Sequence, residues 1–199
     1  MAHKTVARPK PPKVKDGAVK DGAGMYDALD LLAADHVELH GMFHAYQRRR
    51  RHADRLEKGK LALRICQALT VHATIKQEIF YPAVAAVLDG DSDELLGRAS
   101  IEYGGIQDMI SKIEDTAADD PEFDSLIDVL ATYVGRHMKA EEEQLFPKVR
   151  HSRLDLLGTG ERLAARKLEL ATAHLDRQAV GRARKVMGGK MTGQKASPG

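Results

Sequence analysis

The spacing of apolar residues constrains this chain more than any other feature of its sequence. Between residues 26 and 150 they recur at alternating steps of three and four, the pattern of a helix that buries one face against other helices. Four such stripes can be traced, and each has a ligand-capable side chain near its middle: His36, His72, Tyr103 and His137. Because the links between the stripes are short, the pattern predicts an all-α, up-down-up-down antiparallel four-helix bundle.

Composition limits the class of protein further. A length of 199 residues suits one domain, and a chain with four Phe and no Trp must fill its core with aliphatic side chains, which favours helices packed on helices. The single Cys66 cannot form an internal disulfide, and charges and prolines stand where a secretory signal needs an apolar run. We therefore expect a soluble, cytoplasmic protein, and no segment approaches the roughly 20 apolar residues that span a bilayer.

The same patterns divide the chain into four segments. We expect a disordered basic tail over residues 1–24, the bundle over 25–151, an additional helix over 152–180 and a second disordered basic tail over 181–199. Lys, Gly and Pro dominate both tails, and solubilising ends are their plainest interpretation. With a net charge of only +2, we expect no specific nucleic-acid partner and no membrane partner, and the sequence identifies no protein partner.

An internal repeat relates the two halves of the bundle. Residues His72 to Pro82 align without gaps on His137 to Pro147 and share the histidine, a glutamate, an aromatic residue and the proline. One helix upstream, His36 precedes His72 by 36 positions and Tyr103 precedes His137 by 34. His36 and Tyr103 are therefore equivalent places in two helical hairpins.

Three histidines on the seams predict a metal site. Buried imidazoles need partners for their ring nitrogens, and three at one depth satisfy one another poorly without a cation. Glu141 lies one turn beyond His137 on the same face and adds a carboxylate. Histidine and carboxylate side chains that project inward from facing helices are how bundles hold redox metals.

These residues resemble the hemerythrin-like, or HHE cation-binding, family over about residues 26 to 150. The family pattern is His, then HxxxE, then His, then HxxxE over four helices. His36, His72 and the complete motif of His137 and Glu141 match it. The resemblance implies a non-haem iron site, generally with two bridged irons, that serves dioxygen, nitric oxide or peroxide chemistry.

Two positions depart from the family pattern, and both fall at ligand positions. Lys76 stands where the bridging glutamate of the second helix is expected, and Tyr103 stands where the third helix should carry a histidine. Three interpretations stay open. The site is a mononuclear ferric centre with His36, His72, Tyr103, His137 and Glu141; or it is a di-iron centre rebuilt around Tyr103 and one carboxylate; or it holds no metal, and Lys76 pairs with Glu141 instead.

The expected function follows from the resemblance. It implies a hemerythrin-like iron-binding protein that meets a small diatomic or peroxide ligand in sensing, storage or stress protection, and enzymatic turnover is left open. The alternative is a metal-free bundle that acts as a protein-interaction or regulatory module. Two residues could modulate the site: Lys76 through its charge, and His40 as an extra ligand one turn beyond His36. We expect Cys66 to be an inert buried thiol.

Overall fold

The computed structural model describes residues 26–88 and 93–188, which form helices and their connecting turns, with no strand in either range. The main helices are α1 (Ala28–Arg49), α2 (Arg55–Ile75), α4 (Asp93–Asp115), α5 (Phe123–Ala140) and α7 (Leu156–Gly188). Two π-helical turns, η1 (Lys76–Phe80) and η3 (Glu141–Leu145), each lead into a short helix, α3 (Tyr81–Ala85) or α6 (Phe146–Arg150). The expected tail over 1–24 and most of the tail over 181–199 lie outside the described residues.

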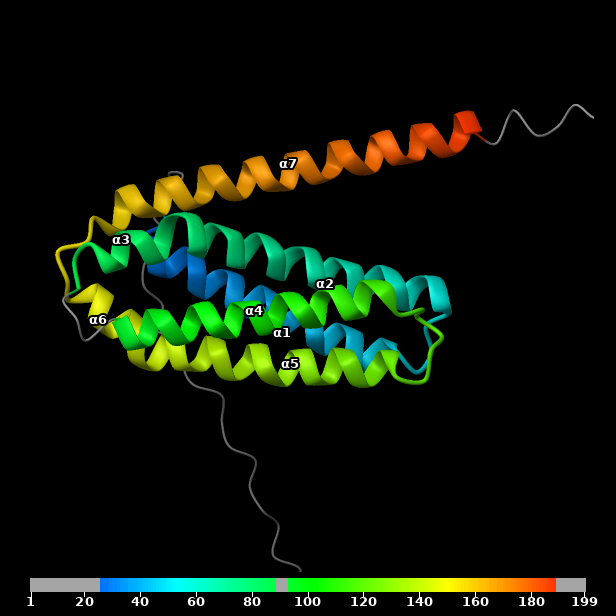
Figure 1. The fold of residues 1–199 in the computed structure, drawn as a ribbon, viewed down its shortest axis with the longest axis horizontal. Coiled ribbons are helices and arrows are strands. Elements are labelled where there is room, and N and C mark those ends of the chain that lie inside the picture. Colours follow the sequence, from blue (N-terminus) through cyan, green and yellow to red (C-terminus); the bar gives the residue numbers. More distant parts are fainter. Residues whose placement is uncertain (1–25, 89–92, 189–199) are drawn as a thin grey trace, which may run out of the picture.

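Helices α1, α2, α4 and α5 lie side by side and form the predicted four-helix bundle (Figure 1). The stripes of the first and fourth helices are buried along their whole length, from Leu29 to Tyr46 and from Ile127 to Leu145. The core has two apolar clusters, one around Phe43 and Leu130 and the other around Leu32 and Phe80. In the first helix His36 falls between Leu32 and Leu39, which belong to different clusters, so the predicted site lies where the two clusters meet.

Local hydrogen bonds set where the bundle helices begin. The side chain of Asp27 accepts from the backbone of Leu29 and Asp30 at the start of α1, and Asp54 accepts from Glu57 at the start of α2. Before α5, the carboxylate of Asp120 accepts from the backbone of Glu122 in a turn, and the helix itself begins at Phe123.

The two π-helical turns fall at equivalent places of the internal repeat. Each begins four residues after a histidine, at Lys76 and at Glu141, and each is followed at once by a helix with proline in its first turn. A proline ring clashes with the carbonyl four residues earlier in a regular α-helix, and the wider π turn relieves that clash. The repeat thus places the residue that follows each histidine by one turn in a locally widened helix.

Helix α7 packs outside the bundle along α1, α2 and η1, and its far end extends away from them (Figure 1). It begins at Leu156 and continues to Gly188, so it is longer than the helix expected over 152–180, and residues 181–188 are helical. Leu163 is fully buried against the bundle. A Cβ at Gly160 would lie 2.5 Å from the backbone oxygen of Tyr26, so only glycine permits this close approach to the start of α1.

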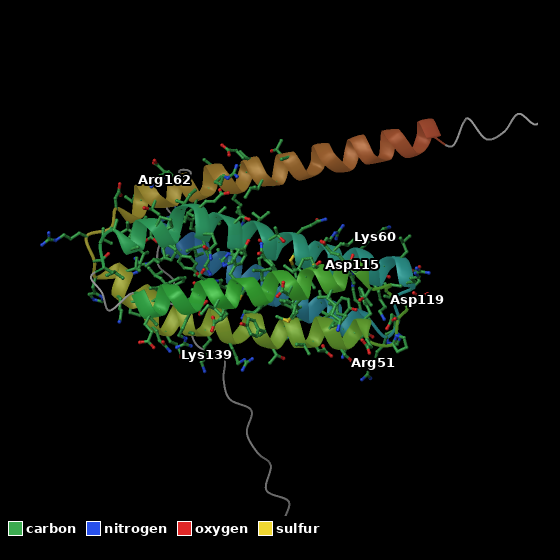
Figure 2. The ribbon with its side chains drawn as sticks, viewed as in Figure 1. Arg51, Lys60, Asp115, Asp119, Lys139 and Arg162 are labelled. Atoms are coloured by element: carbon green, nitrogen blue, oxygen red, sulfur yellow. The ribbon has the colours of Figure 1, made fainter. Side chains whose placement is uncertain are left out.

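Charged side chains cover the outside of the bundle. Figure 2 shows Arg51, Lys60, Asp115 and Lys139 at its surface, while the side chains between the helices fill the interior. Cys66 is buried, and burial raises the pKa of its thiol to about 12, as expected of an inert thiol. Within the described ranges, no helix is both long enough and apolar enough to cross a membrane.

Neighbouring residues of α5 offer a test of the core. We expect Leu130→Ala to lower the free energy of unfolding by about 2–5 kcal/mol, because Leu130 is fully buried and its truncation leaves a cavity. Val129 is 57% exposed, so Val129→Ala is the matched control and should change stability by less than about 1 kcal/mol. Urea denaturation followed by circular dichroism measures both. Equal losses would contradict the assignment of the buried face of α5.

Candidate metal centre

Four of the side chains predicted from the sequence converge in the middle of the bundle. His36, His72, His137 and Glu141 are all at most 9% exposed. One ligand atom from each of His36, His72 and Glu141 lies within 4.8 Å of the other two. The carboxylate oxygen Oε2 of Glu141 is 3.5 Å from Nε2 of His36 and 3.5 Å from Nε2 of His137. The helices therefore bring three imidazoles around one carboxylate.

Nδ1 of each of the three histidines contacts a carboxylate other than Glu141, on the outer side of the imidazole ring. The Nδ1 to oxygen distances are 2.7 Å for His36 to Glu142, 3.2 Å for His72 to Asp35 and 2.6 Å for His137 to Glu102. Because an ionised carboxylate only accepts hydrogen bonds, each Nδ1 carries the proton and each Nε2 keeps a free lone pair. This orientation of histidine by an outer carboxylate is typical of imidazoles that bind metals.

Two of these lone pairs have no hydrogen-bond partner. Nε2 of His36 and Nε2 of His72 are buried and unsatisfied in the part of the chain that the structure describes. A buried polar atom without a partner costs about 1–3 kcal/mol, so such atoms are rare unless a bound group completes them. The two nitrogens and the nearby carboxylate of Glu141 fit one metal ion.

Lys76 occupies the fourth side of the centre. Its ammonium donates to Oε2 of Glu141 at 2.5 Å and to Nε2 of His137 at 3.1 Å, and the side chain is 2% exposed. Burial lowers the pKa of Lys76, and the charge of Glu141 opposes that shift. A positive charge thus stands directly beside the carboxylate of Glu141.

The carboxylate of Glu141 contacts a charged or polar side chain of the centre through each of its two oxygens. Burial alone would raise the pKa of this carboxyl, but the charge of the neighbouring Lys76 holds it well below its usual range. Its other oxygen, Oε1, accepts a hydrogen bond of 2.7 Å from the hydroxyl of Tyr81. Burial and the nearby Glu141 charge raise the pKa of Tyr81, so the phenol stays protonated and donates.

Two residues suggested by the sequence lie elsewhere. The hydroxyl of Tyr103 accepts a hydrogen bond of 2.6 Å from Gln107 on the same helix, and among the described residues no contact joins Tyr103 to the three histidines. Glu102, one residue earlier, faces His137 instead. His40 is exposed and lies near Gly135 of α5. A ferric centre with Tyr103 as a ligand stays a prediction that none of these contacts supports.

Sequence reasoning did not identify the outer carboxylates or Tyr81, although the signal was present. Asp35 and Glu102 directly precede the equivalent positions His36 and Tyr103, and each binds the histidine of the next helix in its own half. Tyr81 and Phe146 are equivalent in the repeat. Tyr81 donates to Glu141, while Phe146 stacks on the ring of His36 with centroids 5.8 Å apart. In each half of the repeat, the aromatic residue thus contacts a side chain of the centre that belongs to the other half.

Comparison with known proteins decides the family. The model of the hemerythrin HHE cation binding domain matches residues 27–149, which is more than half of the chain and contains all four converging side chains. The chain belongs to the hemerythrin HHE cation-binding family. Membership of this family implies a metal-binding site, and the histidine and glutamate cluster described above could hold a metal ion.

Two similar proteins extend the comparison. A crystal structure of a hemerythrin HHE cation binding domain-containing protein from Mycobacterium kansasii is 23% identical, has a TM-score of 0.64 and is covered over 92% of its length by 77% of this chain, which supports the fold. A DNA nickase from Nostoc sp. strain PCC 7120 is 29% identical over 138 residues. That match covers 68% of this chain and only 37% of the nickase.

A double-mutant cycle tests the buried ion pair in metal-free protein. We expect Lys76→Met and Glu141→Gln each to lower the free energy of unfolding by about 3–5 kcal/mol, because each leaves a buried group without its partner. The double variant should lose far less than the sum of the two. The exposed pair of Lys139 and Glu143, 3.8 Å apart, is the control and should show little coupling. Additive losses at Lys76 and Glu141 would show that the two do not pair.

The centre should also make stability depend on pH. Burial and the charge of Lys76 lower the pKa of His72 to about 4 in the folded protein. In the unfolded chain His72 is protonated below about pH 6.5, so between pH 6.5 and 4 the unfolded state binds one more proton than the folded state. Stability of the metal-free protein should therefore fall as pH drops from 6.5 to 4, by ~3 kcal/mol from His72 alone. Urea denaturation at a series of pH values measures this. His72→Gln should flatten the profile and His40→Gln should not; a flat wild-type profile would contradict a neutral buried His72.

Proposed function

We propose that this hemerythrin-like protein binds a single metal ion, iron, with His36, His72 and Glu141 as ligands, while Nε2 of His137 accepts a hydrogen bond from Lys76 beside them. One observation carries the proposal: two buried Nε2 atoms without hydrogen-bond partners face the same carboxylate. Two histidines and one carboxylate form a ligand set typical of non-haem ferrous iron with open coordination positions. This set replaces the ferric site expected from Tyr103.

Lys76 limits the site to one ion in this proposal. A second iron would need another carboxylate near Glu141, and the lysine brings a positive charge to that place instead. The ammonium already neutralises part of the negative charge of Glu141, as a second cation would. Lys76 thus substitutes for the second metal electrostatically.

A bound iron would offer its open positions to a small ligand, and dioxygen, nitric oxide or peroxide are the candidates that the family implies. The residues of the chain supply the surroundings. Lys76 and Tyr81 place an N–H donor and an O–H donor on either oxygen of Glu141, which fixes the orientation of that carboxylate. Phe146 covers the ring of His36. A role in sensing, storage or stress protection and a location in the cytoplasm remain predictions.

A metal-free bundle that serves as an interaction module is the second candidate. The ion pair between Lys76 and Glu141 favours it, because the pair satisfies the carboxylate without a metal. The two candidates differ in what a chelator does. If iron binds, its removal lowers the melting temperature by mass action, and if it does not, a chelator changes nothing.

The Nostoc relative is named a DNA nickase, and most of that protein lies outside the match with this chain. We keep the expectation of no specific nucleic-acid partner. Incubation of supercoiled plasmid with the iron-loaded protein checks it directly, and relaxation of the plasmid above a His72→Ala control would overturn it.

The ligand assignment predicts the effect of single substitutions. We expect His36→Gln and His72→Gln each to weaken ferrous iron binding at least tenfold, because each removes a nitrogen that only the metal satisfies. His40→Gln is the control on the same helix and should leave affinity unchanged, since His40 is exposed. Anaerobic titration with ferrous iron, followed by calorimetry, measures the affinities. Wild-type affinity in both buried variants would contradict the assignment.

A further inference from the structure

A cavity of about 330 Å³ lies between α1, α2 and α7, beside the metal centre, and His72 is one of the residues that line it. Helix α7, which lies beyond the residues that the family model matches, provides one wall through Lys167 and Ala171. Two contacts fix that wall in place: Lys167 forms an ion pair with Asp35 of α1, and Arg166 binds both oxygens of Glu78 at 2.7 and 3.2 Å. The cleft is therefore a built feature of this chain.

The body of the cleft is apolar. Leu39 and Met42 of α1 face it, as do Ala68 and Val71 of α2 and Ala171 of α7. Its volume is at the lower end of the range in which proteins bind small organic molecules. An occupant must therefore be small and present an apolar group to these side chains.

The charges around the cleft specify the polar part of the occupant. On the inner wall, Asp35 and Lys167 neutralise each other. At the rim, Glu38 of α1 and Arg64 of α2 are exposed, and neither forms an ion pair or hydrogen bond with any residue that the structure describes. Two unpaired rim charges of opposite sign, on facing helices, match a ligand that carries one ammonium and one carboxylate.

From this arrangement we infer that the cleft binds a free apolar α-amino acid. Its side chain lies against the apolar wall, its carboxylate pairs with Arg64 and its ammonium pairs with Glu38. A simple organic acid would satisfy Arg64 and be repelled by Glu38, and a simple amine would meet the reverse. The zwitterion complements both. His72 also lines the cleft, but the charged contacts with Glu38 and Arg64 use no ligand of the proposed iron site.

Calorimetric titration of the full-length protein with L-phenylalanine, phenylacetate and phenethylamine tests the inference. We expect saturable binding of phenylalanine, and binding of each analogue that is about tenfold weaker because one charged contact is lost. Arg64→Gln should weaken phenylalanine about tenfold and leave phenethylamine unchanged, while Glu38→Gln should weaken phenylalanine and leave phenylacetate unchanged.

Two further variants make the test decisive. Lys60→Gln removes an exposed charge one turn from Arg64 on the same helix and should not alter binding. Ala68→Trp fills the cleft from a half-buried position and should abolish binding, with circular dichroism confirming the fold. No saturable heat with phenylalanine, or equal affinities for all three compounds, would overturn the inference, whatever the iron content of the protein.

Discussion

The contact between the ammonium of Lys76 and the carboxylate of Glu141 is the interaction on which the centre depends. Both groups are almost fully buried, and charges in such surroundings are costly unless each has a partner. The pair also determines what else can bind, because a positive charge beside Glu141 excludes a second cation from the same place. In the proposed function, the pair therefore limits the centre to one metal ion.

The internal repeat explains how the rest of the centre is held. In each half, an acidic residue of the first helix binds Nδ1 of the histidine on the second, through Asp35 and His72 or Glu102 and His137. The two halves differ in what supports those carboxylates: Asp35 pairs with Lys167 of α7, while the weaker partner of Glu102 is Arg98 of the same helix, 3.9 Å away. The ion pair between Lys167 and Asp35 therefore stabilises one half of the centre. It also holds α7 in place as one wall of the cleft between α1, α2 and α7.

Much of this arrangement could be predicted from the sequence, because the spacing of apolar residues fixes which face of each helix is buried. His36, His72, His137 and Glu141 fall on those faces and converge as expected. Tyr103 did not, because residues 102 and 103 flank the same seam, and the choice between them depends on how α4 is rotated against α5. The position of α7 against the bundle could not be predicted either, because it depends on ion pairs between residues far apart in the sequence, such as Arg166 with Glu78.

Elemental analysis of the wild-type protein and of Lys76→Glu, after anaerobic loading with iron, tests whether Lys76 limits the centre to one metal ion. Lys76→Glu places a carboxylate one turn beyond His72, as Glu141 lies beyond His137. We expect about one iron per wild-type chain and about two per variant chain, since the variant replaces the positive charge of Lys76 with a carboxylate that can bridge two ions. Two irons in the wild type, or no gain in the variant, would contradict the claim that Lys76 stands in for the second metal.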